Sequence, residues 1–170
     1  MILVYCENIT ERHRYIFDFV FGEILGVEMR LTSDPAGFVE SGLLKISYSQ
    51  EELNGSLHIR PHSLLQETGV RAREIITVQW KGLPVFFRVR QPSALPFDPF
   101  AMAFYLVSRY EEYLPFEPDE HGRFRPELSL AFREGFLQIP LVNAVFHEFK
   151  ALLKERFPGL VLPDISFRFI

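Results

Sequence analysis

Cysteine is nearly absent from this sequence of 170 residues, and the single Cys6 excludes a disulfide within the chain. Cys6 follows a short apolar run at residues 2–5, so we expect a buried structural thiol rather than a reactive one. That run is too short for a signal peptide, and Glu7 follows at once. No stretch approaches the roughly 18 apolar residues of a membrane-spanning helix. These absences predict a cytoplasmic protein that does not enter a membrane.

The sequence also lacks an excess of positive charge and the common catalytic signatures. It has 18 Lys and Arg against 22 Asp and Glu, a net charge of −4, which argues against nucleic acid as the main partner. The phosphate-binding loop, the dinucleotide fingerprint, the serine-hydrolase elbow and the zinc-protease helix motif are all missing. There are no internal repeats, and we expect no cofactor in this domain.

The composition is that of a globular protein, with 48% hydrophobic and 24% charged residues. A chain of this length fits a single domain over residues 1–170. The 18 phenylalanines indicate a large aromatic core or an aromatic interface.

The N-terminal half alternates between strand and helix patterns. Residues 2–5 predict a strand buried on both faces, residues 10–25 an amphipathic helix that ends at Gly26, and residues 27–31 a second strand. This order is typical of a right-handed β-α-β unit. Further along we expect a loop at 33–42, strands at 43–48 and 57–60, and a β-hairpin at 75–80 and 84–89.

Two more helices are predicted in the C-terminal half. Asp98 and Pro99 form a helix start, the helix should run over 99–114, and Pro115 should end it. A second helix is expected over 141–157. The fold class predicted from these patterns is α/β, three-layered, with a mixed β-sheet, helices on both faces, helix 99–114 close to the sheet, and the hairpin at an edge.

Charge is unevenly distributed along the chain. Residues 57–92 contain six Lys and Arg against two acids, and residues 98–136 contain eight acids against four Arg. Either the two segments neutralise each other across the fold, or the uneven charge indicates a dedicated anion site.

Candidate functional residues gather between positions 97 and 136. Arg109, Glu111 and Glu112 fall near one another on the predicted helix. The two carboxylates form either an acid–base pair or ion pairs that seat the helix. We expect Arg109 or the nearby Arg123 to make a bidentate contact with Glu111 or Glu112.

A turn follows, with Asp119, His121 and Arg123 around Gly122. It could bind an anion or shuttle a proton. Alternatively, Asp119 caps the turn and Arg123 returns to Glu111 or Glu112.

His58 and His62 have the spacing of a zinc-binding pair, but that spacing brings two imidazoles together only on a helix. Pro61 favours an extended chain, in which they would lie about 13 Å apart. We predict that they share no metal, and we assign no metal site.

Segment 97–136 resembles a bacterial family in which a domain of unassigned function precedes a polysaccharide-deacetylase-like catalytic barrel. The matching sequence motifs are F-Y-L-V-S-R-Y-E-E-Y at 104–113, D-E-H-G-R-F at 119–124, S-L-A-F at 129–132 and G-F-L-Q-I-P-L-V at 135–142. The N-terminal half is similar only loosely. Residues 165–170 alternate like a strand and then stop, so we expect a cut at a domain boundary just before the barrel.

Deacetylases of this kind hold a divalent metal with an Asp pair and two His, and residues 1–170 contain none of those motifs. The resemblance therefore implies an accessory, non-catalytic domain whose partner is a C-terminal deacetylase-like domain of the same chain, with a glycan as a second candidate partner. The docking or binding candidates are Arg109, Glu111, Glu112, Asp119, His121 and Arg123. The alternatives are a small self-sufficient enzyme that uses Glu111, Glu112 and His121, and a carbohydrate-binding module with an aromatic platform drawn from Trp80, Tyr105, Tyr110 and Tyr113.

Overall fold

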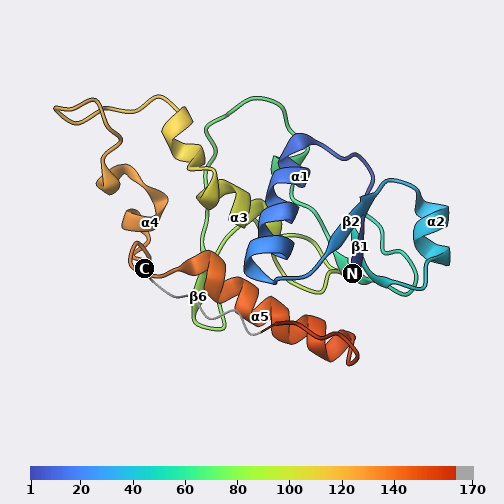
Figure 1. Cartoon of the computed structure of the whole chain (residues 1–170). Coiled ribbons are helices and arrows are strands. Elements are labelled where there is room, and N and C mark those ends of the chain that lie inside the picture. Colours follow the sequence, from blue (N-terminus) through green and yellow to red (C-terminus); the bar gives the residue numbers. More distant parts are fainter. Residues whose placement is uncertain (164–170) are drawn as a thin grey trace.

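A parallel sheet of four strands forms the centre of the computed structural model, which describes residues 1–163 (Figure 1). The strands lie in the order β2–β1–β3–β4. Their bounds are β1 Ile2–Cys6, β2 Met29–Thr32, β3 Leu44–Tyr48 and β4 Leu57–Ile59. All pairs are parallel, with Ile2 opposite both Met29 and Leu44. The carboxyl ends of these strands therefore meet at one edge of the sheet.

The central strand β1 is buried along its whole length. Ile2, Val4 and Cys6 face the main hydrophobic core, while Leu3 and Tyr5 face a smaller one. Successive side chains of a strand point to opposite faces, so a continuous apolar run is what a strand covered on both sides requires. The predicted buried strand is confirmed.

One face of the sheet is covered by α1 (Glu11–Phe17), which continues as a π-helix over Asp18–Ile24. Thr10 caps its first turn, and Gly26, at φ 62°, ends it in the left-handed conformation that glycine adopts readily. The predicted helix and its glycine stop are confirmed. On the same face lie α3 (Pro99–Val107) and α5 (Leu141–Arg156).

Aromatic rings fill the space between these helices and the sheet. The rings of Phe17 and Phe100 are 4.7 Å apart and edge-to-face, and both contact Tyr48 at the end of β3. Phe146 and Phe149 of α5 pack on the other side of Phe100. Edge-to-face pairs of this kind add to the free energy gained by burying the rings. Many of the 18 phenylalanines thus serve the core.

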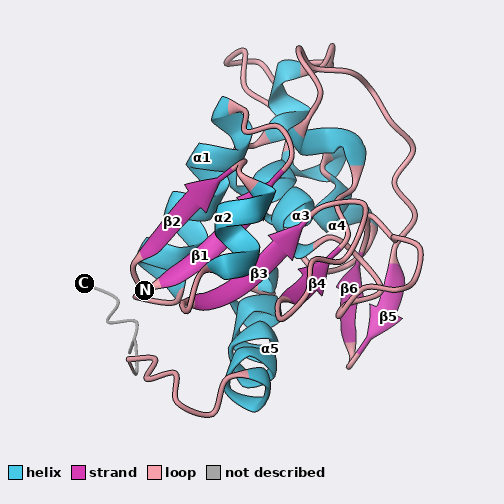
Figure 2. Cartoon of the chain, turned by 90° about the vertical axis from the view of Figure 1, so that its right-hand side faces the viewer, coloured by secondary structure: helices cyan, strands magenta, loops and turns pink. Residues whose placement is uncertain are grey.

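The opposite face is covered by a short helix, α2 (Pro35–Glu40), where a loop was expected (Figure 2). Asp34 caps this helix and Pro35 occupies its first turn, the same start signal as Asp98 and Pro99. The buried Phe38 packs on Tyr5 with ring centroids 5.5 Å apart. The α/β class with helices on both faces is confirmed, but α2 supplies the second face, since α1 and α3 share the first.

The predicted hairpin is present, with β5 (Val78–Trp80) antiparallel to β6 (Leu83–Val85). Lys81 and Gly82 between them both have positive φ, as the tightest hairpin turns require. The hairpin forms a sheet of its own. Parallel and antiparallel pairing are therefore divided between two sheets instead of being mixed in one.

Helix α3 ends at Val107, seven residues before the predicted end at 114. Beyond it the chain forms an arm, residues 108–140, that stands away from the sheet (Figure 1, yellow to orange). The arm contains the one-turn helices Tyr110–Tyr113, Pro126–Leu128 and α4 (Leu130–Arg133). A further one-turn helix, Ser63–Leu65, follows β4. The strand predicted at 165–170 lies outside the described residues, and none of the helices described is long and apolar enough to cross a membrane.

The fully buried Asp98 joins α3 to the carboxyl edge of the sheet. Its Oδ1 accepts the backbone N–H groups of Phe100 and Ala101, both at 3.0 Å. Its Oδ2 accepts the hydroxyl of Tyr48 and, at 2.7 Å, the N–H of His62. A buried carboxylate is tolerated only when its oxygens are satisfied in this way.

Burial raises the pKa of Asp98 to about 6, although its four hydrogen bonds oppose the shift. The folded protein therefore binds more protons than the unfolded chain between the ordinary pKa of 3.8 and about 6. The contribution of Asp98 to stability is full below that window and is lost as the pH rises through it. The buried His13 acts in the opposite sense, because burial lowers its pKa from 6.5 to about 4.

We predict that Asp98→Asn lowers the free energy of unfolding by about 1–3 kcal/mol at about pH 7. The new amide N–H₂ would face the N–H of His62, so two donors would meet without an acceptor. The loss should be larger at about pH 5, because Asp98 gains protons there and asparagine does not. Urea unfolding at the two pH values measures both effects.

The control is Asp34→Asn, at the exposed start of α2. Asparagine caps helices as well as aspartate does, so this variant should change stability by less than about 0.5 kcal/mol. Equal losses in the two variants would contradict the role given to Asp98.

Candidate functional site

Arg109 breaks the helix on which the candidate residues were expected to share a face. Its backbone is left-handed, with φ 54° and ψ 46°, between α3 and the turn Tyr110–Tyr113. A residue with a Cβ adopts this conformation at a cost. The helical spacing assumed for Arg109, Glu111 and Glu112 is therefore wrong, and the two carboxylates contact different parts of the arm.

Glu111 points to the start of α4. Both of its carboxylate oxygens accept the backbone N–H of Leu130, at 2.9 and 3.1 Å. Arg133, one turn further, has its Nη2 3.8 Å from Oε1. The side chain is only 16% exposed, and burial raises the pKa of Glu111 even though these contacts favour the charged form. Glu111 thus ties α4 to the end of α3.

Glu112 pairs with Arg109 through one nitrogen and one oxygen, Nη2 and Oε1. The expected pairing of Arg109 with one of the two glutamates is present, but the contact is not the bidentate one that we expected. The Arg109 side chain is 72% exposed. Exposed pairs of this kind contribute little to stability.

Asp119 organises the turn that follows. Its Oδ1 accepts the backbone N–H groups of His121 and Arg123, both at 2.8 Å, and its Oδ2 accepts from Arg123 Nε at 3.1 Å. These bonds lower the pKa of Asp119. Asp119 therefore caps the turn as one alternative held, but Arg123 pairs with Asp119 and not with Glu111 or Glu112. His121 is exposed on the outside, 3.4 Å from Glu120.

Two adjacent hollows lie between the end of α3, the turn 115–125 and α4. The first, of about 320 Å³, contains Arg109, Glu111 and Glu112 in its lining. The second, of about 650 Å³, contains Arg109, Glu112, Asp119 and Arg123. The structure therefore brings five of the six candidates together around these hollows, and His121 lines neither of them.

Sequence reasoning missed the apolar part of this site. Leu106, Ala131 and Leu137 line the first hollow and also a third one, of about 250 Å³, that reaches Ile139 and the start of α5. Leu137 is 52% and Ile139 is 41% exposed. Such residues belong to no chemical motif. The only signal was a largely apolar sequence at 136–140, outside any predicted helix or strand.

The two candidate zinc ligands lie in different surroundings. His58 is buried in β4 and its Nδ1 is 3.2 Å from Ser47 Oγ on the neighbouring strand. His62 follows β4, its ring stacks on Phe87, and its Nδ1 accepts the N–H of Leu64. Leu57–Ile59 is the strand expected there. Within the described residues, no three His, Cys, Asp or Glu side chains are grouped as metal ligands.

The acidic segment pairs its arginines locally, whereas in the basic segment, residues 57–92, only Arg73 pairs with an acid of its own segment. In the acidic segment Arg109, Arg123, Arg125 and Arg133 all pair with acids of that segment. In the basic segment Arg73 pairs with Glu67. Over residues 1–163 no ion pair joins the two segments, so the mutual neutralisation considered from the sequence does not occur through direct pairs.

The family model of DUF7033, described as a family of unknown function, matches residues 2–158. The chain therefore belongs to this family. Neither a curated protein nor a solved structure matches it.

We predict that Glu111→Ala lowers the free energy of unfolding by about 1–2 kcal/mol, because it leaves the N–H of Leu130 without its acceptor in a half-buried position. Glu112→Ala, which removes only an exposed ion pair, should lower it by less than about 1 kcal/mol. Urea unfolding of the two neighbouring variants provides the comparison. An equal loss in both would contradict the structural difference drawn here.

Proposed function

We propose that this DUF7033 domain is an accessory, non-catalytic domain that docks through its arm onto a polysaccharide-deacetylase-like catalytic domain of the same chain. The nature of the partner follows from the resemblance of residues 97–136 and 135–142. The docking surface follows from the arm itself. We name it the apolar strip: Leu106, Ala131, Leu137 and Ile139.

The observation that carries the proposal is that Leu137 and Ile139 of the apolar strip are exposed on a part of the chain that stands away from the sheet, beside the half-buried Leu106 and Ala131 (Figure 1). Phe132 and Tyr113, also in the arm, are 50% and 71% exposed. Contiguous exposed apolar residues mark interaction surfaces. Arg109, Glu112, Asp119 and Arg123 line the neighbouring hollow. An apolar centre beside a charged rim is the usual anatomy of a protein interface.

The engagement of the two glutamates supports a non-catalytic role. An acid–base pair needs a carboxylate that is free to exchange a proton with a substrate. Glu111 instead holds the start of α4, and Glu112 holds Arg109. The enzyme alternative also needs His121, which lies on the outer turn beside Glu120. The geometry does not favour that alternative.

The aromatic residues considered for a sugar platform lie mostly inside the fold. Tyr105 and Tyr110 are buried and stack on each other with centroids 5.2 Å apart. Trp80 packs edge-to-face on Phe97. Of the four, Tyr113 alone is largely exposed. A sugar platform needs open ring faces, so the arm fits a protein partner better than a glycan.

The reading frame beyond codon 170 provides the first test, and it should encode a deacetylase-like domain. In the protein encoded by that full frame, Leu137→Asp combined with Ile139→Asp should speed amide hydrogen exchange across residues 105–139. The reason is that two buried charges would separate the domains. Exchange followed by mass spectrometry gives the measurement.

Val39→Asp is the control, because this apolar side chain is similarly exposed but lies on α2, outside the arm. It should leave exchange in the arm unchanged. A stop codon after residue 170 would contradict the proposed partner. Equal effects of the double variant and the control would contradict the proposed surface.

A further inference from the structure

Apart from the three hollows of the arm, a hollow of different chemistry lies at the carboxyl edge of the parallel sheet. It has a volume of about 360 Å³ and is lined by Gln50, Arg60, Pro61, His62, Ser63, Arg88, Val89 and Arg90. We call it the basic hollow. We propose that it binds the phosphate group of a small molecule. It shares no residue with the hollows of the arm, and nothing in the proposed docking role depends on it.

The first argument is its position. Gln50 comes just after β3, and Arg60, Pro61 and His62 come directly after β4. Since the strands are parallel, these residues meet at the same edge. Ligands of open parallel α/β sheets bind outside the carboxyl ends of the strands. The basic hollow therefore lies where this architecture provides a site.

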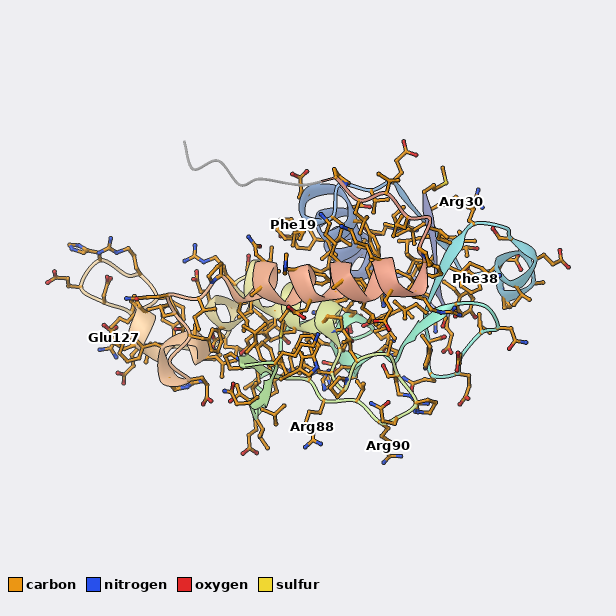
Figure 3. The ribbon with its side chains drawn as sticks, turned by 90° about the horizontal axis from the view of Figure 1, so that it is seen from below. Phe19, Arg30, Phe38, Arg88, Arg90 and Glu127 are labelled. Carbon is orange, nitrogen blue, oxygen red and sulfur yellow. The ribbon has the colours of Figure 1, made fainter. Side chains whose placement is uncertain are left out.

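The second argument is uncompensated charge. Three arginines line the hollow, and no acidic residue does. Within residues 1–163, Arg60, Arg88 and Arg90 make no ion pair with any acid. Arg88 and Arg90 project from the same stretch of chain, on one side of the molecule (Figure 3). Like charges gathered without a partner repel one another, and an anion between them relieves the repulsion.

The third argument concerns unused donors. The Nε of Arg60 is buried and has no hydrogen-bond partner among the described residues. A buried donor without a partner is rare and points to a missing acceptor. His62 adds a second donor: its Nδ1 accepts the N–H of Leu64, so the proton of the neutral ring is on Nε2. Burial, and the charge of Arg73, lower the pKa of His62 and favour this neutral form.

These features select the class of ligand. One carboxylate offers two oxygens and satisfies a single arginine fork. Three arginines suit a group with more acceptors and a double charge, as in a phosphate monoester. The volume is at the lower end of small-molecule sites, and the net charge of −4 disfavours nucleic acid. A small phosphorylated molecule or free phosphate fits best.

Titration calorimetry of the purified chain tests the proposal, with inorganic phosphate, a hexose phosphate and the unphosphorylated hexose as probes. Sodium chloride of equal ionic strength serves as the blank. We expect saturable binding of the phosphorylated probes and none of the free hexose. Tighter binding of the hexose phosphate would assign the site to phosphate monoesters, and equal affinity would assign it to free phosphate.

Arg88→Ala combined with Arg90→Ala should weaken binding by about tenfold or more. Arg30→Ala combined with Arg71→Ala is the matched control. It removes the same charge from two exposed arginines that make no ion pair within residues 1–163 and do not line the hollow. Circular dichroism verifies that both variants are folded. Absence of saturable binding by the unaltered chain, or equal weakening in the two variants, would overturn the proposal.

Discussion

The buried carboxylate of Asp98 is the constraint on which the arrangement of the other elements depends. It caps the first turn of α3 and at the same time holds the hydroxyl of Tyr48 and the backbone of His62. Three segments far apart in the sequence are thereby fixed at one point. A charge buried so completely would be unfavourable without these bonds. These hydrogen bonds fix the position of α3 on the sheet. In that position Phe100 packs against Phe17 and Tyr48.

Fixing α3 also determines what lies beyond its ends. Before its start, the chain that leads to Asp98 contains Arg88 and Arg90 of the basic hollow. Beyond its end, Leu106 lines the hollows of the arm, and Arg109 turns the chain away in a left-handed conformation. The arm therefore projects at an angle set by one backbone residue, and Glu111 holds it there by binding the start of α4. The exposure of Leu137 and Ile139 is a consequence of this geometry.

Local signals in the sequence were sufficient for the strands and helices whose residues follow a clear period. The apolar run of β1, the stop at Gly26 and the start at Asp98 and Pro99 are of this kind. The α2 helix carried the same start signal, but Asp34 and Pro35, together with Gly37 and Gly42, were interpreted as loop residues. The sequence carried no signal for the end of α3 at Val107, because an arginine at position 109 does not by itself indicate a positive φ. The charged half of the site was found from residue type, whereas the apolar half depends on which side chains the fold leaves exposed.

The two charged segments show how the fold separates two kinds of surface. The arginines of the acidic segment form ion pairs with acids of the same segment, and these pairs connect parts of the arm to one another. Arg60, Arg88 and Arg90 of the basic segment pair with no acid among the described residues and remain at the sheet edge. The two surfaces share no lining residue, yet α3 connects them, since Asp98 binds His62 of the basic hollow and Leu106 lines the hollows of the arm. This connecting helix has its first turn fixed by buried hydrogen bonds to Asp98.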